Sequence, residues 1–507
     1  MTEPKSFIPR QFNETQWVWF LAFMGLLTRL PMLRLCSAET TDGVLCLSYF
    51  SPDFVQTPRF IILPGYPALI WLGQQVGIPG WLWGRLLSAL AGLLFLIPLW
   101  KFSRRWVPVE MSGLICLMAV FSPLLWFWSL KVMPDTLFLM AFWWCLERLT
   151  AVYIDKNPAA WWQGSLLGAL AALTRPEGFL LLPWILLLGF SLSSQKPWQK
   201  AVGISIIWWA PIYFMSQKLM LLISAYQEGM GLTDGEGKIR FPVLNLIDHF
   251  YAYLSQPLYV FSPLLFWFAV LGLAKMVRRK GPEGEALKKI LLQIFILLFI
   301  SRLIPATYQD RHMLPFLPLI LMAAGYHLEV FFESLDKGRG AIRILFMRNA
   351  LLTLCMGWLA LFSAAVLISQ NDSFGDIKRS AQYLATLPPD AVIYSDEIPK
   401  TQYWSGRKAR LMTHLIENAP FLPNQGDYVV LHSFYLSRMG AFERHLVEAN
   451  GAELLHDDQS MVVPLLTDVM EETSLQNRTA ATAFRFVPQF FRSRVYHIGK
   501  ALEKEKT

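Results

Sequence analysis

Residues 134–152 read PDTLFLMAFWWCLERLTAV, a largely apolar run with the carboxylate of Asp135 in its first turn. A run of this length can cross the hydrocarbon layer of a membrane as a helix. Similar blocks of about 15–25 residues recur along the chain and predict eleven membrane-spanning helices. We expect spans near 17–35, 82–101, 109–128, 134–152, 160–173, 177–192, 201–224, 257–277, 288–306, 313–332 and 349–369.

The composition favours the same class, an α-helical polytopic membrane protein. The chain has 507 residues, of which 54% are hydrophobic and 16% charged, whereas soluble domains carry about 25% charged residues. The apolar residues are bunched rather than spaced as in a globular core, which excludes a soluble enzyme, a disordered chain and a nucleic-acid-binding domain. The net charge of +8 is typical of the basic excess in cytoplasmic loops.

Basic residues near the span ends predict the orientation. Arg104–Arg105, Lys196–Lys200, Lys275–Lys280 and Lys337–Arg348 lie in alternate loops, and such loops face the cytoplasm. With eleven spans, the N-terminus is then inside, and everything after about residue 370 is outside.

Three parts follow along the chain. Residues 1–369 are expected to form the membrane module, with long outer loops at 36–81 and 225–256. Residues 370–470 predict a small extracytoplasmic α/β domain, because helical and strand patterns alternate there. Residues 471–507 form a basic, aromatic tail, suited to a membrane surface.

Finer elements are also predicted. The broken apolar stretch within the first outer loop indicates interfacial helices, and that loop holds two cysteines, Cys36 and Cys46, whose pairing stays open. In the α/β domain we expect a helix at 377–387, strands at 391–394 and 428–432, a helix at 441–450, and a closing hairpin of 452–455 with 461–466.

Ionisable residues gather at the predicted outer ends of the spans. Charges beside the hydrocarbon layer are unfavourable unless they are paired or used. A carboxylate can act as a general base or a metal ligand, and the arginine fork can bind two phosphate oxygens at once. The set therefore predicts a site for a lipid-linked phosphate. Its members are Glu39, Asp42, Lys131, Asp135, Arg175, Glu177, Arg302, Asp310, Arg311 and His312.

Each residue also has a purely structural interpretation. Asp135 is suited to stabilising a helix dipole, and Arg311 to anchoring at the interface by snorkelling. His312 is more typical of a packing neighbour than of a metal ligand. Asp42, followed by Gly43, fits an ordinary turn, and the break at 174–178 fits either a cavity wall or a simple hairpin turn.

Several of these residues belong to an ordered set of short motifs. The motifs are Thr28-Arg29-Leu30-Pro31, Leu63-Pro64-Gly65-Tyr66-Pro67, Arg85-Leu86-Leu87-Ser88-Ala89, Met133-Pro134-Asp135-Thr136-Leu137, Leu173-Thr174-Arg175-Pro176-Glu177-Gly178, Arg311-His312-Met313-Leu314-Pro315, Gly375-Asp376-Ile377 and Tyr394-Ser395-Asp396-Glu397. With them the chain resembles GT-C class glycosyltransferases, close to the bacterial relatives of protein O-mannosyltransferases and of the lipid A aminoarabinose transferase. It departs from that pattern at Gly43, where the family often has Glu, and at His312, where it usually has Tyr.

The resemblance implies a GT-C-like fold and a transfer reaction at the outer face of a bacterial inner membrane. A sugar on a polyprenyl phosphate would pass, with inversion, to a glycan, lipid or protein acceptor. Asp42 would be the general base, unless Glu39 substitutes for it. Asp135 would either position the acceptor or hold a divalent metal ion together with Asp42.

The resemblance also implies how the lipid phosphate is held. Arg311, with Arg175 or Lys131, would bind it and stabilise its charge as it leaves. The supporting residues would be Glu177, Arg302 and His312. No nucleotide-binding loop is needed, and no phosphate-cradling glycine-rich motif is present in the sequence.

A transporter or a flippase for a lipid-linked glycan is the competing class, and a scaffold is a third. Transporters place charges near the bilayer midplane and often carry inverted repeats. Here the ionisable residues lie at predicted span ends, and no repeat is visible in the sequence. A site that joins Asp42, Asp135 and Arg311 would favour the enzyme.

Overall fold

The computed structural model describes residues 13–34, 38–51, 62–192, 197–229, 262–298, 310–336, 341–369, 371–411, 423–432, 443–444, 446–448, 451–462 and 489–499. These residues fall into two compact units. The helical unit holds the described residues of Met1–Leu33 and Ile61–Val366, and the sheet unit holds those of Arg34–Phe60, Leu367–Leu465 and Thr482–Thr507. Each unit is described by itself below.

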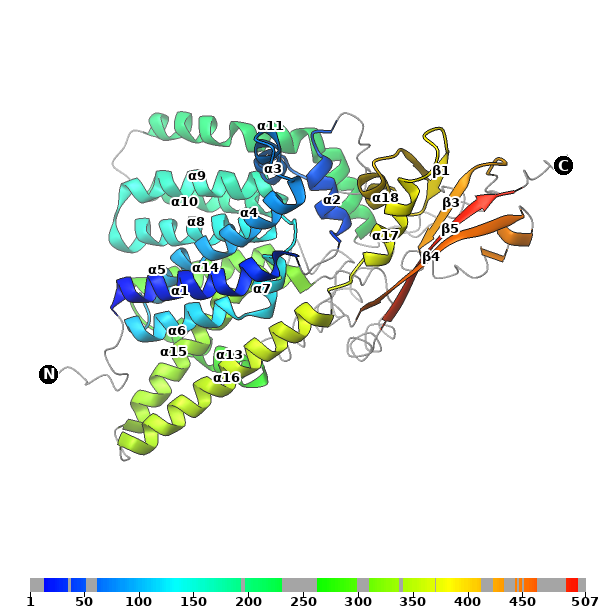
Figure 1. The fold of residues 1–507 in the computed structure, drawn as a ribbon. Helices are drawn as coiled ribbons and strands as arrows, with labels where there is room; N and C mark the ends of the chain where they lie inside the picture. Colours follow the sequence, from blue (N-terminus) through cyan, green and yellow to red (C-terminus); the bar gives the residue numbers. More distant parts are fainter. Residues whose placement is uncertain are drawn as a thin grey trace. The chain divides into compact units, whose positions relative to one another are not determined.

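The helical unit consists of α-helices joined by short connections and 3₁₀ turns (Figure 1). Its helices α8, α9 and α10 lie side by side, and α13 packs along α15. The elements are α1 (Glu14–Arg29), η1 (Leu30–Arg34), α3 (Gly65–Gln75), α4 (Gly80–Leu94), α5 (Leu96–Ser103), α6 (Val109–Val120), α7 (Pro123–Trp128), α8 (Asp135–Asp155), α9 (Pro158–Thr174), η2 (Pro176–Leu181), α10 (Leu182–Leu192), α11 (Pro197–Gly229), α13 (Pro263–Arg278), α14 (Pro282–Leu298), η4 (Asp310–Phe316), α15 (Leu317–Asp336) and α16 (Ala341–Ser369).

Local signals in the sequence explain where several helices begin. Asn13 and Gln16 cap α1 reciprocally, each side chain accepting from the other's backbone N–H, which satisfies donors that a helix start leaves open. At the start of α9 the side chain of Asn157 accepts from the backbone N–H of Ala159, and Pro158 occupies the first helical position, where its fixed φ favours the helix.

Four helices in the described part of the chain are long and apolar enough to cross a membrane. They are Gly80–Ser103, Asp135–Asp155, Arg311–Ser334 and Phe346–Ser369. Each of the four overlaps a predicted span. The predicted total of eleven membrane-spanning helices stays a prediction. The predicted span 109–128 is divided into α6 and α7, because Pro123 lacks the N–H that a continuous helix would require.

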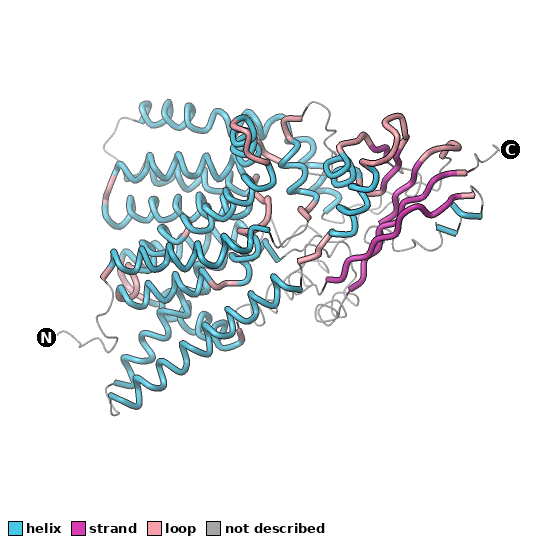
Figure 2. The backbone as a smooth tube through the Cα atoms, viewed as in Figure 1, coloured by secondary structure: helices cyan, strands magenta, loops and turns pink. Residues whose placement is uncertain are grey.

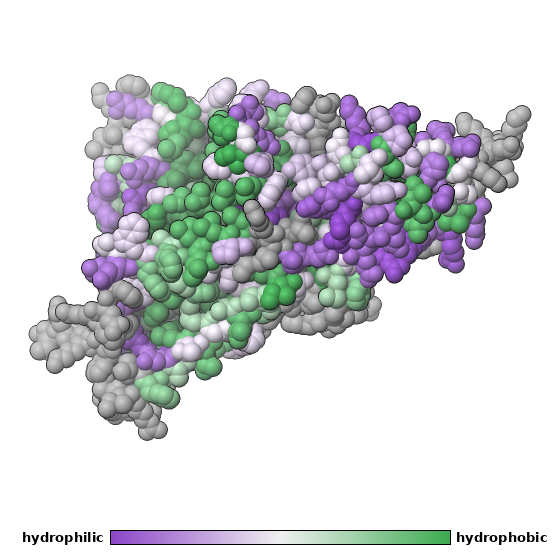
Figure 3. Space-filling model, in the orientation of Figure 1, coloured by the Kyte–Doolittle hydropathy of each residue, from purple (hydrophilic) through white to green (hydrophobic). Residues whose placement is uncertain are grey.

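The exterior of the helical unit is apolar. Figure 3 shows hydrophobic side chains covering its helices on the face in view. Large apolar side chains that are mostly exposed include Trp19 and Phe23 on α1, Ile206 on α11, and Leu361 on α16. Such a surface would be unfavourable in water, so it fits hydrocarbon.

The described part of the predicted first outer loop, 36–81, contains two short helices. They are α2 (Thr41–Ser48) and α3, which agrees with the expectation of helices there. The described residues of Arg34–Phe60 are grouped with the sheet unit rather than with the membrane helices, a division that the sequence did not predict. Cys36 lies outside the described residues, as does the second outer loop beyond Gly229.

The sheet unit contains a five-stranded mixed sheet (Figure 2). The strand order is β2-β1-β3-β5-β4; β1 pairs in parallel with β2 and β3, and β5 pairs antiparallel with β3 and β4. In addition to α2, the elements of this unit are α17 (Gly375–Leu384), β1 (Ile393–Ser395), α18 (Ile398–Ser405), β2 (Ala409–Leu411), β3 (Tyr428–His432), β4 (Ala452–Val462) and β5 (Gln489–Ile498).

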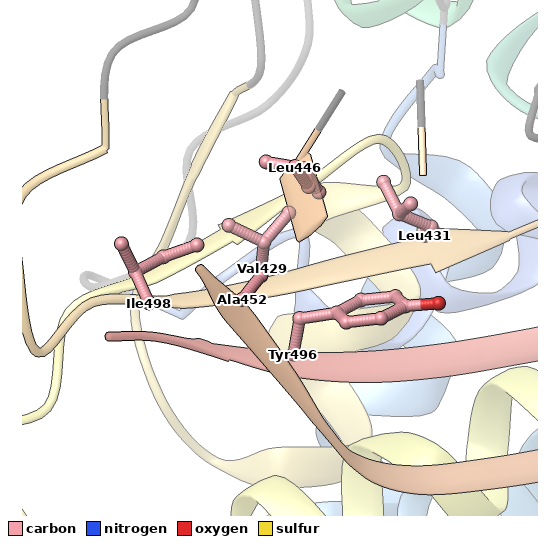
Figure 4. Close-up of a cluster of buried hydrophobic side chains, with 6 residues drawn as sticks. All are labelled: Val429, Leu431, Leu446, Ala452, Tyr496 and Ile498. Carbon is pink, nitrogen blue, oxygen red and sulfur yellow. The ribbon is translucent and has the colours of Figure 1, made fainter. Parts of the chain in front are cut away.

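Both faces of the central strands are buried. Figure 4 shows Val429 and Leu431 of β3 gathered with Ala452, Tyr496 and neighbouring side chains on one face. On the other face, Val430 packs with Leu384 of α17 and with two strand residues, Ile393 and Val495. Alternate residues of a strand point to opposite faces, so β3 carries core on both sides.

Two expectations for this unit were wrong. The predicted hairpin of 452–455 with 461–466 is wrong, because 452–462 are one continuous strand, β4, whose partner is β5. The stretch 489–498 is therefore an internal strand with Val495 and Ile498 fully buried, not a separate membrane-surface segment. The predicted helix 377–387 and the strands near 391–394 and at 428–432 are confirmed by α17, β1 and β3.

Candidate functional site

The carboxylate of Asp135 lies at the N-terminus of α8, and the residue is 3% exposed. The partial positive charge of a helix N-terminus stabilises an anion there. Its Oδ2 atom is buried and accepts no hydrogen bond from the residues described. Dipole stabilisation is therefore only part of its role, because a buried carboxylate needs further partners.

Arg175 is the main partner of Asp135. Its guanidinium forms an ion pair with Asp135 and contacts Glu177 through two atoms, with Nη2 2.9 Å from Oε1 and Nε 3.2 Å from Oε2. Arg175 is extended between α9 and η2, because the following proline, Pro176, disfavours the helical conformation of the residue before it.

The close approach of this turn to α9 depends on a glycine. A Cβ atom on Gly178 would lie 2.3 Å from the backbone nitrogen of Ala172. Only glycine fits there without displacing backbone. The predicted helix break at 174–178 is thus confirmed.

Arg311 on η4 approaches the same carboxylate. Its Nη1 atom lies 3.9 Å from Asp135 Oδ2 and 3.7 Å from the sulfur of Met133. Its guanidinium carbon is 5.8 Å from the centroid of the Trp128 ring, within the range of a cation–π contact. The neighbouring His312 is buried.

Lys131 lies in the connection between α7 and α8 and is 1% exposed. Its Nζ atom is 5.5 Å from the centroid of the Phe127 ring. A lysine this deeply buried is unusual unless its charge is compensated or used.

Hydrogen bonds from α4 fix the turn that carries Asp135. Ser88 Oγ donates to the carbonyl of Met133 at 3.1 Å, and Thr136 Oγ1 donates to the carbonyl of Ser88 at 3.0 Å. The hydroxyl of Tyr66 lies 2.7 Å from Ser88 Oγ and 2.7 Å from the carbonyl oxygen of Gly84. Tyr66, Ser88 and Thr136, which come from three separate sequence motifs, thus hold the turn before α8 in place.

Two buried arginines were not predicted as site residues. Arg29, 1% exposed, donates from Nε to Ser129 Oγ at 3.0 Å and from Nη1 to Thr28 Oγ1 at 3.0 Å. Arg85 donates to the carbonyl of Leu33 at 2.5 Å. Each is a charged residue in an apolar block, a signal that marks intramembrane ionisable residues as functional candidates.

The ionisable site residues named above carry net positive charge, because three are cations (Lys131, Arg175 and Arg311) and two are carboxylates (Asp135 and Glu177). Asp135 and Glu177 face the guanidinium of Arg175, with Arg311 close to the first carboxylate. Lys131 adds a further buried cation to the segment that leads into α8. Such a set can hold an anion, and guanidinium groups match a phosphate with two hydrogen-bond donors each.

The other residues predicted for the site, Glu39, Asp42 and Arg302, are not among the described residues of the helical unit. Asp42, half-buried, and Glu39, fully buried, belong to the sheet unit. Asp42 lies in the first turn of α2, whose N-cap is Thr40, which accepts from the backbone N–H of Gly43 at 3.1 Å. Arg302 lies outside the described residues.

The sheet unit contains a buried ionisable cluster that sequence reasoning missed. His432 at the end of β3 is fully buried, and its Nδ1 contacts a carboxylate oxygen of Asp396, whose other oxygen accepts from the His432 backbone N–H at 3.0 Å. Burial disfavours the imidazolium, but the charge and hydrogen bond of Asp396, with Asp376 and Glu397, outweigh it and raise the pKa of His432. Burial raises the pKa of the Asp376 and Glu397 carboxyls.

The carboxylates that were expected to hold a metal ion, Asp42 and Asp135, belong to different units. No group of three or more His, Cys, Asp or Glu side chains suited to a metal occurs in the described part of the chain. The carboxylate of Asp135 is already paired with Arg175 and has Arg311 nearby. Two guanidinium groups repel a cation, so this surrounding favours an anion.

No protein-family model and no curated protein matches the chain. Among solved structures, it is similar to ArnT from Cupriavidus metallidurans bound to undecaprenyl phosphate, at 13% identity and a TM-score of 0.53 over 82% of this chain and 93% of that one. It is also similar to the Archaeoglobus fulgidus oligosaccharyltransferase in complex with Zn and sulfate, at 11% identity and a TM-score of 0.50, over 78% of this chain and 62% of that one. The same oligosaccharyltransferase tethered with an acceptor peptide containing the NVT sequon matches at 10% identity and a TM-score of 0.50, over 79% of this chain and 64% of that one.

These likenesses concern the fold. The GT-C-like fold that the resemblance implied is confirmed. Together with the apolar helices, it makes the chain an integral membrane protein.

Proposed function

We propose that this protein is a membrane glycosyltransferase that takes its sugar from a polyprenyl-phosphate donor. The observation that carries the proposal is the buried carboxylate of Asp135, paired with Arg175 and approached by Arg311 at 3.9 Å. Carboxylate and arginines beside hydrocarbon suit a substrate with a phosphate group on an apolar tail. The ligand named for ArnT, undecaprenyl phosphate, has this chemistry.

The reaction that we propose is a single displacement. An acceptor hydroxyl or amine of a glycan, lipid or protein attacks the anomeric carbon, and the bond from that carbon to the phosphate oxygen breaks on the opposite face. The acceptor proton passes to the carboxylate of Asp42, and the bond electrons leave with the polyprenyl phosphate. The anomeric configuration inverts, and no covalent enzyme intermediate is formed.

The cations have a definite part in this reaction. Negative charge grows on the phosphate as the bond breaks, and preorganised donors aimed at developing charge stabilise the transition state. Arg311 and Arg175 supply guanidinium groups, and Lys131, in the connection that leads into α8, supplies an ammonium group. Glu177 holds Arg175 in place through two contacts, so the fork is oriented before substrate binds.

A divalent metal has no step in this proposal. The surroundings of Asp135 favour an anion, and the described residues offer no group of ligands. Asp135 is proposed instead to orient the arginines and the acceptor. Its Oδ1 is paired with Arg175, and its Oδ2 lies 3.9 Å from Arg311 Nη1, so the carboxylate faces both guanidinium groups.

We further propose that the site and the sheet unit lie on the extracytoplasmic side of a bacterial inner membrane. The basic loops support this orientation. A reporter active only outside the cytoplasm, fused after Leu466, is expected to give signal. Signal from a cytoplasm-only reporter at that position would reverse the orientation.

The function is tested with the purified protein in lipid nanodiscs and a panel of radiolabelled polyprenyl phosphosugars. Transfer of label to an extracted glycan, lipid or protein fraction, with release of polyprenyl phosphate, is the expected result. Movement of intact labelled lipid between leaflets of proteoliposomes, without release of polyprenyl phosphate, would instead indicate a flippase. Lys131, Asp135, Arg175 and Arg311 lie at helix ends or in the short turns between long helices, which favours the enzyme.

A further inference from the structure

A hydrogen bond inside the sheet unit ties the short helix α2 to the C-terminal domain. Thr41 Oγ1 donates to Glu397 Oε1 at 2.9 Å, although the two residues are 356 positions apart. Thr41 is the first residue of α2, and Glu397 precedes α18, which packs against α2. A half-buried side-chain bond between elements so distant in sequence restricts how α2 can move.

Glu397 is itself firmly held. Its backbone N–H donates to Ser395 Oγ at 3.0 Å, and Ser395 Oγ also lies 2.8 Å from Thr401 Oγ1. The carboxylate is buried, with Lys400 Nζ 4.0 Å from Oε1. A carboxylate fixed in this way is a rigid anchor, because its rotamer is set by packing and by its neighbours.

The position of Lys400 is fixed as well. It is 1% exposed, and its Nζ atom lies 3.4 Å from the centroid of the Phe374 ring. Both contacts hold the Lys400 side chain beside Glu397.

Asp42 follows Thr41 directly, in the first turn of α2. The apolar residues of the same helix, Val44 to Leu47, are buried. The bond from Thr41 to Glu397 therefore adds, to the burial of the apolar side of α2, a fixed point one residue before Asp42.

We propose that Glu397 is a positioning residue that, through Thr41, holds the carboxylate of Asp42 in its working place. This inference rests on the proposed function, in which Asp42 is the general base. Misplacement of a catalytic group by about 1 Å can lower a rate by about a hundredfold. Loss of the tether therefore lowers the rate of transfer rather than the affinity for the donor.

The first test removes only the hydroxyl. Thr41→Val is expected to lower kcat about tenfold to a hundredfold while leaving KM for the polyprenyl phosphosugar unchanged, and Thr41→Ser is expected to restore kcat. The matched control is Thr386→Val, which removes a hydroxyl bonded only within its own turn, to the carbonyl of Tyr383 at 2.7 Å. Wild-type kcat in Thr41→Val would overturn the inference while leaving the proposed function intact.

The second test addresses the carboxylate. Glu397→Gln keeps an oxygen that can accept from Thr41, so kcat should stay within about twofold to threefold of the wild type, whereas Glu397→Ala should match Thr41→Val. The double variant Thr41→Val with Glu397→Ala should be no slower than Glu397→Ala alone, because residues that act through one contact are not additive. Independent, multiplied losses would overturn the inference.

A third measurement does not depend on activity. Thr41→Val should speed amide hydrogen exchange in α2, and Thr386→Val should not, because exchange reports local opening. Unchanged exchange in α2 would show that the tether does not hold the helix. Absence of transfer by the wild-type protein, with faster exchange in Thr41→Val, would overturn the proposed function and the catalytic part of this inference while leaving the tether.

Discussion

The guanidinium of Arg175 is ion-paired with the carboxylate of Asp135, although 40 residues separate them along the chain. One stands at a helix break and the other at a helix start, so both are placed by helix ends rather than by a long side-chain reach. Helix ends carry open backbone donors and partial charge. This pairing joins two sequence motifs into one site.

The pair predicts a large stability difference between two arginine substitutions. Removing one partner from a buried ion pair typically lowers the free energy of unfolding by about 3–5 kcal/mol. Arg175→Met should therefore lower the thermal unfolding temperature clearly. Arg104→Met is the control, because its pair with Glu14 is largely exposed and such pairs contribute about 0–1 kcal/mol. Equal shifts for both variants in the same detergent would show that the Asp135–Arg175 pair is not buried in solution.

The hydroxyl network beneath Asp135 makes a separate prediction. Ser88→Ala removes the donor to the Met133 carbonyl and leaves that buried acceptor unsatisfied. The loss should lower the free energy of unfolding by about 1–3 kcal/mol. We expect lower stability and slower transfer, because the turn that carries Asp135 loosens. Ser205→Ala, which removes an exposed intrahelical bond, should change neither. Normal kcat in Ser88→Ala would show that the turn is held by other contacts.

Asp42 is predicted to act by taking the acceptor proton. A positioned base typically contributes about 10²–10⁴-fold, so Asp42→Asn should lower kcat by that factor while the lipid donor still binds. Asp42→Glu should also be slow, because the added methylene displaces the carboxylate. If Asp42→Asn transfers normally and Glu39→Gln is inactive, the base is Glu39 instead.

Stability of the sheet unit is predicted to depend on pH through His432. Its raised pKa means that the folded state holds a proton which the unfolded state releases near pH 6.5, so the contribution is complete below that pH and is lost as the pH rises through the folded pKa. The groups that face it are Asp396, Asp376 and Glu397.

The measurement is thermal unfolding of the wild type and of His432→Asn between about pH 6 and pH 9. Asparagine can still donate to Asp396 but cannot titrate in this range. The wild type should lose stability with rising pH more steeply than the variant. Parallel curves would mean that His432 is neutral in the folded state.

Much of the helical unit could be predicted from local patterns. Apolar blocks identified spans that the helices follow, and the turn at 174–178 follows from a proline and a glycine. The meeting of Asp135, Arg175 and Arg311 was expected because each stands at a span end. The break between α6 and α7 was missed, because hydropathy alone does not register the missing N–H of Pro123.

The sheet unit was harder because its partners are far apart in sequence. Arg494 is one of the basic residues that made the tail 471–507 look suited to a membrane surface, but its charge is compensated by Glu443 and by Asp457, with Nε 3.3 Å from Oδ2. The bond from Thr41 to Glu397 spans 356 residues. No periodicity or local motif reports such pairings, since register between distant strands is set by tertiary contacts.

The central claim, that the arginines beside Asp135 hold a lipid phosphate, is tested most directly by binding of undecaprenyl phosphate to the purified protein in nanodiscs. A charge-assisted contact is worth about 1.5–3 kcal/mol, so Arg311→Ala should bind about tenfold to a hundredfold more weakly. Arg311→Lys should recover only part of the affinity, because the fork is lost. Arg104→Ala should bind as the wild type does. Equal affinity of Arg311→Ala and the wild type would contradict the account and leave Arg311 as a membrane anchor.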